Sequence, residues 1–362
     1  MRIIISGGGT AGHTHPALAI AEEIAMREKK ENILFVLRSG GRENKIIEER
    51  GFKIEYIDVA GLKRSLSFKN IATLTKALRA KEACKKIIRD FRPDIVLGTG
   101  GYVCWPLIKA AEEMKIPSAL HESNSTPGLT TRLLSHGCSL VMTSFEGSKR
   151  HFPRALTVNV GNPLLGGFGE LSRETCRARL GVPRSDIMIL SVGGSLGARR
   201  LNSVVGEVMR DISKKHKNLT FIHSVGERNR DQIIPSPSGR VRMVPYITNM
   251  AEQLGACDIV ISRCGAMTLS EIALAGRAAI LIPSPNVTGN HQYKNARALC
   301  DEGAAVMIEE SELSRELLLS KIEELINNPK RRSELAGKIS SYARADARAK
   351  IYECLRGLVK AR

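Results

Sequence analysis

The strongest constraint on the fold is an alternation of short apolar runs with helical stretches, which the chain carries twice. In the first half, seven apolar runs rich in β-branched residues predict strands at residues 2–6, 32–38, 52–57, 94–100, 117–122, 139–145 and 156–161. Helical patterns lie between several of them, as at residues 16–29 and 44–51. Continuous apolar strands that alternate with helices are typical of a parallel sheet covered by helices on both faces.

The same pattern restarts after a glycine-rich segment at residues 161–174. Apolar residues in this segment follow neither the helical nor the strand periodicity, so it is predicted to be a linker. Six further strands are predicted at residues 186–194, 219–225, 241–247, 257–263, 278–284 and 304–310, and helices at residues 198–215 and 268–276. The sequence therefore predicts an α/β chain of two Rossmann-like domains, residues 1–162 and 163–339. We expect a C-terminal helix, residues 340–362, to pack back on the first domain.

Composition narrows the class of protein further. Of the 362 residues, 4% are aromatic and 43% are apolar, which suits an aliphatic α/β core and not a disordered chain. The eight cysteines are scattered without a C-x-x-C pair, as expected of reduced thiols in a cytoplasmic protein without structural zinc. The chain begins without a signal-peptide pattern, and no stretch approaches the roughly 20 apolar residues of a spanning helix.

The net charge of +18 predicts an anionic partner, such as a phosphorylated ligand, a nucleic acid or an anionic membrane surface. Residues 61–92 alone hold ten Lys or Arg against Glu82 and Asp90, a local charge of +8. The chain has one Trp, few aromatic residues and no recognised nucleic-acid module, and these features argue against nucleic acid.

Glycine-rich loops follow the predicted strands, at the ends where α/β sheets bind ligands. Residues 7–12, 98–102 and 193–198 are such loops, and their backbone N–H groups can approach an anion. The first contains G-x-G-x-x-G, as dinucleotide-binding proteins do, but the second strand ends in Arg38 and not in the acid that holds an adenosine ribose. An NADP-dependent oxidoreductase can use an arginine there, so that alternative stays open.

Residues 263–271, after another predicted strand, form a fourth candidate loop. A helix is predicted to open at Thr268, with Glu271 in its first turn. The Glu271 carboxylate offers only acceptors, so it can bind both hydroxyls of a ribose. The alternative is that Glu271 caps the helix, which stabilises a helix by roughly 0.3–1 kcal/mol.

Seven motifs together carry a family resemblance. They are GGGTAGH-x-x-P at 7–16, GTGGYV at 98–103, HESN at 121–124, GNP at 161–163, GGSLGA at 193–198, RCGAMTLSE at 263–271 and HQYKNA at 291–296. In this order and at these separations they resemble the MurG family, the lipid-linked N-acetylglucosamine transferases of bacterial peptidoglycan synthesis. The resemblance implies a GT-B fold, in which two Rossmann-like domains with parallel sheets face each other across a cleft.

The resemblance also implies an inverting sugar transfer. N-acetylglucosamine moves from UDP-N-acetylglucosamine (UDP-GlcNAc) to the C4 hydroxyl of the muramoyl sugar (MurNAc) in lipid I, the undecaprenyl-diphosphate-linked MurNAc-pentapeptide, and the product is lipid II. A UDP-GlcNAc 2-epimerase, which shares the fold and the donor, is the nearest alternative. Protein partners in the cell-wall machinery are compatible with this function, and the sequence names none.

Carried over by position, the resemblance assigns the second domain to UDP-GlcNAc. Ile247 is expected to meet uracil through its backbone, Ser195 to bind the diphosphate, and Glu271 to hold the ribose. Gln292 is expected to bind hydroxyls of the donor sugar. Residues expected to line the diphosphate and sugar are Ala266, Met267, Thr268, Leu269 and Ser270, and those expected to close over the sugar from the first domain are Thr10, Ala11, Gly12 and Asn124. Residues expected at the acceptor diphosphate are Gly8, Gly9, Gly100, Gly101 and Tyr102.

The chain departs from the family pattern at several positions. Leu165 stands where an arginine is frequent, and Arg263 and Arg199 are candidates to replace it. Ser123 and His291 stand where glutamines are common, and Ala11 replaces a glycine. These differences affect individual contacts and not the expected activity.

Inverting transfer needs stabilisation of the departing diphosphate and a base for the hydroxyl proton. His13 is the candidate base, or a group that only orients the loop, and Glu122 is a weaker rival base. His15 precedes Pro16 at the predicted helix start and is expected to be structural. The chain lacks the D-x-D motif of many metal-dependent sugar transferases, so we expect no metal ligands and no required cofactor.

An acceptor anchored in the membrane would explain the basic segment at residues 61–92, which could contact the membrane surface. Apolar and basic residues recur there at helical spacing: Phe68, Lys69, Ile71, Leu74, Lys76 and Leu78. The pattern favours a helix lying on an anionic membrane surface, although an ordinary amphipathic helix shows the same spacing. We therefore expect a peripheral protein on the cytoplasmic face of the bacterial inner membrane.

Overall fold

The computed structural model describes residues 1–41, 44–61, 69–194, 197–235 and 238–360, without the side chains of Ala11 and of residues 69–71. The chain divides into two compact units. Unit 1 is Met1–Leu165 with Asp346–Arg362, and unit 2 is Gly166–Ala345.

Unit 1 contains a seven-stranded sheet in the order β3-β2-β1-β4-β5-β6-β7, and all its strand pairs are parallel. The strands are β1 Ile3–Ser6, β2 Ile33–Arg38, β3 Lys53–Ile57, β4 Ile95–Gly98, β5 Ser118–Glu122, β6 Leu140–Thr143 and β7 Thr157–Asn159. The helices are α1 Ala11–Arg27, α2 Lys45–Glu49, α3 Lys69–Phe91, α4 Cys104–Glu113, α5 Leu129–Leu134 and α13 Ala347–Lys360, with short 3₁₀ turns at Lys30–Asn32 and Glu146–His151.

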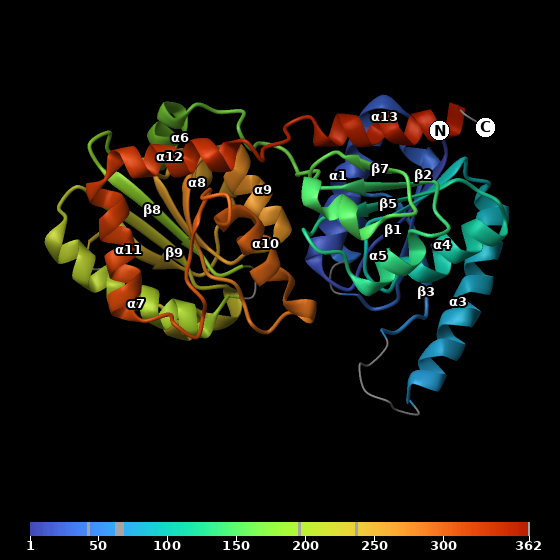
Figure 1. Cartoon of the computed structure of the whole chain (residues 1–362), viewed down its shortest axis with the longest axis horizontal. Helices are drawn as coiled ribbons and strands as arrows, with labels where there is room; N and C mark the ends of the chain where they lie inside the picture. The colour runs from blue at the N-terminus through green and yellow to red at the C-terminus, as the bar shows by residue number, and fades with distance from the viewer. Residues whose placement is uncertain (42–43, 62–68, 195–196, 236–237, 361–362) are drawn as a thin grey trace. The chain divides into compact units, whose positions relative to one another are not determined.

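The helices of unit 1 cover both faces of its sheet. Ile3 and Ile5 of β1 pack in one apolar cluster with α1, α2 and α13, whereas Ile4 packs in a second cluster with α3, α4 and Leu134 of α5. Because each central strand is buried on both sides, its sequence is a continuous apolar run and not an alternating one. Figure 1 shows α13 lying beside α1, although the two helices are far apart in the sequence.

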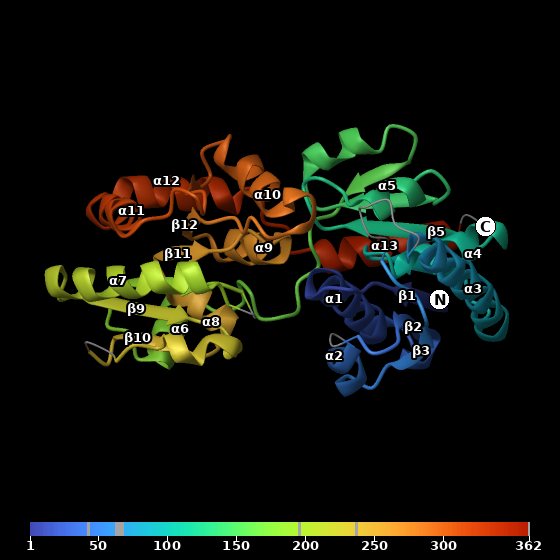
Figure 2. The same cartoon turned by 90° about the horizontal axis from the view of Figure 1, so that it is seen from below.

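Unit 2 repeats the plan with a six-stranded parallel sheet in the order β10-β9-β8-β11-β12-β13. The strands are β8 Ile187–Val192, β9 Leu219–Ser224, β10 Val241–Val244, β11 Ile259–Ser262, β12 Ala278–Leu281 and β13 Val306–Met307. The helices are α6 Arg173–Leu180, α7 Arg199–Lys215, α8 Met250–Ala256, α9 Ala266–Ala275, α10 His291–Cys300, α11 Arg315–Asn327 and α12 Pro329–Ser340, with 3₁₀ turns at Glu227–Gln232 and Thr288–Asn290. Figure 2 shows α11 and α12 side by side at one edge of the unit.

The predicted strands all form, but several helix and domain boundaries differ from prediction. Unit 1 ends after Leu165 and not after residue 162, because Leu164 is buried and Leu165 packs against the apolar cluster of α1 and α13. The C-terminal segment is not one helix from residue 340. Helix α12 ends at Ser340 and packs on α9 and β12 of unit 2, whereas α13 begins at Ala347 and belongs to unit 1.

Helix α1 also begins earlier than predicted. It starts at Ala11, after Thr10 in an extended conformation, so Pro16 is the sixth residue of the helix and not its first. The residue before the helix is therefore part of the glycine loop, and the N–H groups of the first helical turn lie at that loop. An anion at the loop would face a helix N-terminus directly. Among the described residues, no helix has the length and apolar character that crossing a bilayer requires.

Candidate active site

Two glycine loops of unit 1 interlock at the carboxyl edge of the sheet. They follow β1 and β4, which are neighbouring strands, and the Thr99 N–H donates to the Ser6 carbonyl at 2.9 Å. Gly101 has a φ of +81°, and a Cβ at this position would lie 2.3 Å from the Gly8 carbonyl oxygen. Only glycine allows this approach of one backbone to the other. The two loops that the sequence assigned to the acceptor diphosphate therefore form one backbone surface.

His13 lies in the first turn of α1 with its ring against the second loop. Its Nδ1 is 3.2 Å from the Thr99 carbonyl oxygen, and the Thr99 hydroxyl donates to the His13 carbonyl at 2.8 Å. A Cβ at Gly100 would lie 2.6 Å from Nδ1, so a side chain there would displace the ring. Since a carbonyl only accepts, the hydrogen bond assigns the proton of the neutral ring to Nδ1. Nε2 is then the basic nitrogen of His13.

Tyr102 covers the outer side of the first glycine loop. Its ring lies 3.2 Å from the positions that a Cβ on Gly9 and a Cβ on Gly61 would occupy. Its hydroxyl accepts a hydrogen bond of 2.9 Å from Nη1 of Arg38, at the end of β2. The Arg38–Tyr102 pair was not predicted from the sequence, because 64 residues separate its members.

Glu122 is 2% exposed at the end of β5, and its own loop surrounds it. One carboxylate oxygen accepts from the backbone N–H and the side-chain amide of Asn124, each at 3.0 Å, and the other accepts from the Gly128 N–H at 3.3 Å. Burial raises the pKa of Glu122 above its ordinary value, although these donors oppose the rise. Through these hydrogen bonds the Glu122 carboxylate stabilises the loop that carries Asn124.

The GNP motif, residues 161–163, also hydrogen-bonds to the loop that carries Asn124. The Asn162 side-chain amide donates to the Ser123 carbonyl at 3.2 Å, and Nε2 of His121 lies 3.0 Å from the Gly161 carbonyl. Burial lowers the pKa of His121 to about 4, so this ring is neutral and cannot act as an acid at physiological pH. Two motifs that are 40 residues apart thus form a single supporting structure.

In unit 2 the glycine loop after β8 packs tightly on the neighbouring strand end. Gly197 has a φ of +73°, and a Cβ there would lie 1.9 Å from the Val225 carbonyl oxygen. Beneath the loop, Asn202 donates to that same carbonyl at 2.9 Å, and its Oδ1 lies 3.1 Å from Nε2 of the buried His223. Ser195, predicted to bind the donor diphosphate, lies outside the described residues.

Replacing Gly197 with alanine should destabilise unit 2 strongly. The overlap with a backbone oxygen adds to the left-handed φ, and we expect a loss of about 3 kcal/mol or more. Gly194 is a matched control because its φ is +87° but no atom of the described residues lies within 4 Å of its Cβ position. Gly194→Ala should cost only about 1–2 kcal/mol. Calorimetric unfolding measures both variants, and equal losses would contradict the steric argument.

Helix α9 presents its N-terminus after β11, as the motif at residues 263–271 predicts. The prediction for Glu271 was wrong in one respect. The helix begins at Ala266, so Glu271 is its sixth residue, and no acid occupies the first turn. Glu271 therefore does not cap the helix, because the exposed N–H groups are confined to the first turn. Its side chain is partly buried and forms no hydrogen bond or ion pair with the described residues. Desolvation raises the pKa of Glu271 to about 7.

Two side chains from α10 hold the turn that leads into α9. Oε1 of Gln292 accepts from the Cys264 N–H at 3.2 Å and from the Ser284 N–H at 2.9 Å. The side-chain amide of the fully buried Asn295 donates to the Cys264 carbonyl at 3.2 Å. Gln292 thus holds this turn through Oε1, and its Nε2 forms no hydrogen bond with the described residues. Sequence reasoning missed Asn295, although it lies within the HQYKNA motif.

The remaining predicted donor residue, Ile247, lies in the loop after β10. Its side chain is buried, while the neighbouring Tyr246 is exposed. Burial of the side chain holds the backbone of Ile247 in place, as a backbone contact to a base requires. Ala266 and Leu269 are also buried, while Met267, Thr268 and Ser270 are partly exposed.

The comparisons with known proteins cover both units. Residues 3–143 match the glycosyltransferase family 28 N-terminal domain, and residues 188–351 match its C-terminal domain. The UDP-N-acetylglucosamine–N-acetylmuramyl-(pentapeptide) pyrophosphoryl-undecaprenol N-acetylglucosamine transferase of Caldanaerobacter subterraneus is 41% identical over 98% of this chain and 99% of its own length. The chain belongs to glycosyltransferase family 28. It is a sugar transferase, and the predicted family is confirmed.

Solved structures of similar proteins agree on the fold. MurG of Acinetobacter baumannii matches with a TM-score of 0.78 at 26% identity over 98% of this chain and 99% of that one. The α/β class with two Rossmann-like domains of the GT-B type is thereby confirmed. A UDP-GlcNAc 2-epimerase from Neisseria meningitidis matches with a TM-score of 0.67 at 15% identity over 99% of this chain and all of that one, which shows a shared fold alone.

Arg263, one candidate to replace the arginine expected at the position of Leu165, makes several contacts within unit 2. The Arg263 side chain is 11% exposed, forms an ion pair with Glu310 and donates to the Ile282 carbonyl at 3.1 Å. These contacts join the strand ends and pair its charge with Glu310. Arg199, the other candidate, is exposed at the start of α7 and pairs with Asp231 at 2.8 Å. Leu165 itself packs against the apolar cluster of unit 1.

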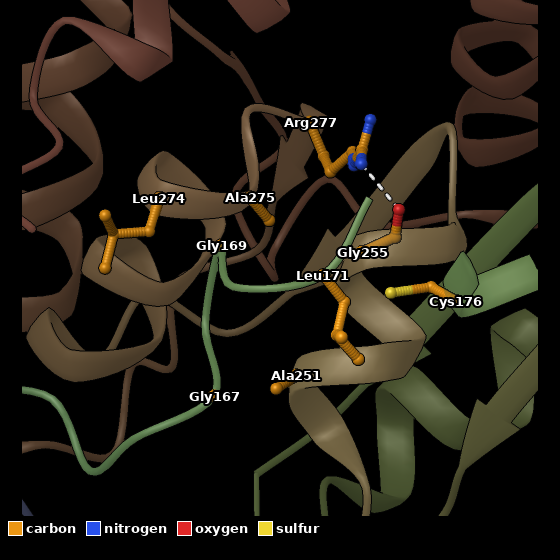
Figure 3. A pocket seen from close by; sticks show the side chains of 9 residues that line it. All are labelled: Gly167, Gly169, Leu171, Cys176, Ala251, Gly255, Leu274, Ala275 and Arg277. Atoms are coloured by element: carbon orange, nitrogen blue, oxygen red, sulfur yellow. Dashed lines mark hydrogen bonds between the residues drawn. The ribbon is translucent and has the colours of Figure 1, made fainter. Parts of the chain in front are cut away.

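Unit 2 also has a pocket at the opposite edge of its sheet. Figure 3 shows the Arg277 side chain reaching the Gly255 carbonyl beside Cys176. Gly255 lies just before β11 and Arg277 just before β12, so the pocket faces the amino ends of the strands. Sheets of this family's type bind ligands at the carboxyl ends. None of the predicted site residues lines this pocket.

Proposed function

We propose that this enzyme transfers N-acetylglucosamine from UDP-GlcNAc to the C4 hydroxyl of MurNAc in lipid I and releases lipid II and UDP. The observation that carries the proposal is the similarity, over nearly the whole chain, to transferases whose names state this reaction. The side chains support it. One unit holds a histidine at two glycine loops whose Nδ1 meets a carbonyl. The other holds Glu271, which has no hydrogen-bond or ion-pair partner among the described residues, in the helix that begins after β11.

In the proposed reaction the acceptor oxygen attacks the anomeric carbon of the donor sugar as the bond to the diphosphate breaks. The C4 hydroxyl gives its proton to Nε2 of His13, and the leaving diphosphate takes the bonding electrons. The N–H groups at the start of α9 and at Gly193–Gly194 stabilise the charge that builds on that diphosphate. Glu271 accepts hydrogen bonds from the ribose hydroxyls, and the Nε2 group of Gln292 donates to the sugar.

Glu122 has a supporting role in this proposal and is not the base. Its two oxygens already accept hydrogen bonds from Asn124 and Gly128. A general base needs an oxygen within reach of the substrate proton, and removing these donors would release the loop. The acceptor diphosphate lies at Gly8, Gly9, Gly100 and Gly101, where the two loops meet.

We propose that the reaction needs no metal ion. The support is the absence of a D-x-D motif in the sequence and the presence of backbone donors and a helix N-terminus for the diphosphate. The test is transfer of labelled N-acetylglucosamine from UDP-GlcNAc to a short-chain lipid I analogue with EDTA present. Labelled disaccharide product is expected. Product only after added Mg²⁺ or Mn²⁺ would overturn the metal proposal alone.

Absence of product under both conditions would contradict the proposed transfer. Formation of the mannosamine epimer from UDP-GlcNAc without acceptor would favour the epimerase alternative. Binding of NADP in place of UDP-GlcNAc would favour the oxidoreductase.

We propose further that α3 contacts an anionic membrane surface. The second half of the helix is anchored by the buried Ala80, Cys84 and Ile88, while its first turns project beyond the rest of unit 1 (Figure 1). On those turns Leu74 and Leu78 are 53% and 46% exposed. Lys76 and Arg79 are exposed beside them, and Lys76 also pairs with Asp58 at 2.9 Å. Phe68 lies outside the described residues, as do the side chains of Lys69 and Ile71.

The combination of apolar and basic side chains suits peripheral attachment at the cytoplasmic face of the inner membrane. We expect binding to vesicles of anionic lipid that weakens with rising salt. Changing both Leu74 and Leu78 to serine should weaken vesicle binding about tenfold or more, because the area removed is apolar. Leu156→Ser is a matched control, since Leu156 is 65% exposed elsewhere in unit 1.

Vesicle sedimentation and the short-chain transfer assay should be run on the same variants. We expect the double serine variant to retain transfer to a soluble acceptor. Vesicle binding that is unaffected by the double change, or equally affected by Leu156→Ser, would contradict a membrane role for α3.

A further inference from the structure

Arg38 occupies a position that the proposed mechanism does not use. It is the last residue of β2, which pairs with β1 in parallel register. Its side chain is exposed at the carboxyl edge of the sheet, beside the loop that follows β1. In NAD-binding domains this strand end carries an acid for a ribose, whereas a cation here favours an anionic group such as a phosphate.

Hydrogen bonds hold both the backbone and the guanidinium of Arg38 in place. The Asn44 side-chain amide donates to the Arg38 carbonyl at 2.9 Å, and the next residue's N–H donates to the Ile57 carbonyl at 3.1 Å. In the side chain, Nε donates to the Ser39 carbonyl at 3.3 Å and Nη1 donates to the Tyr102 hydroxyl at 2.9 Å. A long, exposed side chain rarely keeps one orientation without such contacts, because ordering it costs conformational entropy.

Tyr102 connects this cation to the glycine loops. Its ring lies between Gly9 and Gly61, at 3.2 Å from the Cβ position of each. Because the hydroxyl accepts from Arg38, its own proton can be donated, and it has no acceptor among the described residues.

We propose that Arg38, oriented by Tyr102, is a cationic contact for the acceptor diphosphate. The inference rests on the proposed function and extends it, because it adds a charged residue to a site otherwise made of backbone. The planar guanidinium can bind two phosphate oxygens at once, and the Tyr102 hydroxyl adds a third hydrogen bond. The glycine loops give the diphosphate close backbone approach, and Arg38 supplies the positive charge.

The kinetic test compares Arg38→Gln and Tyr102→Phe with the wild-type enzyme and with Arg50→Gln. Arg50 is a matched control, since it is 51% exposed in unit 1 and pairs with Glu22 on the surface. For Arg38→Gln we expect KM for a short-chain lipid I analogue to rise about tenfold or more. KM for UDP-GlcNAc should stay near the wild-type value. Tyr102→Phe keeps the ring on Gly9, so its acceptor KM should rise about threefold.

A binding measurement separates this inference from the proposed function. Geranyl diphosphate is titrated into wild type and into Arg38→Gln by calorimetry, and we expect about tenfold weaker binding by the variant. If the wild-type enzyme fails to transfer sugar but binds the diphosphate through Arg38, the proposed function falls and the diphosphate contact stands. Equal acceptor KM and equal diphosphate affinity in the two proteins would overturn the inference, and so would a wild type that neither transfers nor binds. Circular dichroism of each variant checks that it is folded.

Discussion

Replacing His13 with alanine is expected to lower kcat by about 10²–10⁴-fold and to leave KM for UDP-GlcNAc within a few-fold of wild type. The reason is the assigned tautomer. The Thr99 carbonyl binds Nδ1–H and makes Nε2 the basic nitrogen. A base contributes only when the acceptor hydroxyl loses its proton, so its removal affects the transition state and not donor binding.

His13→Asn separates a base from an orienting group. The asparagine amide can still donate to the Thr99 carbonyl, but it cannot take up a proton near neutral pH. If His13 is the base, His13→Asn should be as slow as His13→Ala. Recovery of turnover in His13→Asn would instead assign His13 to loop positioning. His136→Ala, which changes an exposed histidine of the same unit, should leave both kcat and KM unchanged.

Replacing Glu271 with glutamine is expected to weaken UDP-GlcNAc binding about tenfold or more at pH 8, because one acceptor oxygen becomes a donor that faces the ribose hydroxyls. The same variant should be more stable than wild type at that pH. Burial raises the pKa of Glu271 from 4.5 to about 7, so the folded chain holds this proton more tightly than the unfolded chain does.

The direction of the pH dependence follows from that difference. Between pH 4.5 and about pH 7 the folded state binds more protons at this site, so the stability contributed by Glu271 falls as pH rises through this window. Above pH 7 the charged form is buried at a cost on the order of 3 kcal/mol. Glu271→Gln avoids this cost, so its stability advantage should grow from pH 5 to pH 8. Donor binding to wild type should strengthen over the same range, since the charged carboxylate is the better acceptor.

Denaturant unfolding and donor titration at pH 5, 6, 7 and 8 measure both effects. Glu309→Gln is the control, because Glu309 is an exposed carboxylate of the same unit. We expect no pH-dependent difference between Glu309→Gln and wild type. A constant stability difference between Glu271→Gln and wild type across the four pH values would contradict the raised pKa. Unchanged donor affinity would contradict the ribose contact.

The strands and the two-unit plan were predictable from the sequence because they depend on local pattern. The predicted strand at residues 2–6 centres on three consecutive isoleucines, Ile3, Ile4 and Ile5, and such a continuous apolar run is typical of a strand buried on both faces. The close approach of Gly101 to the Gly8 carbonyl and of Gly197 to the Val225 carbonyl was not predicted, because the sequence indicated only that these loops can bind an anion. The motifs placed each loop at a strand end, and family membership followed from their order and separations.

The tertiary structure alone decided what the side chains at those loops do. Nothing within the GGGTAGH motif indicates that Nδ1 of His13 meets a carbonyl 86 residues away. Likewise, the position of Arg263 after a strand suggests a ligand contact, but Glu310 and the Ile282 carbonyl turn it inward. Periodicity and motif spacing report which residues reach one edge of a sheet. Hydrogen-bond partners, tautomers and pKa values depend on atoms that distant segments bring there, so the sequence determined the place of the chemistry and packing determined each residue's part in it.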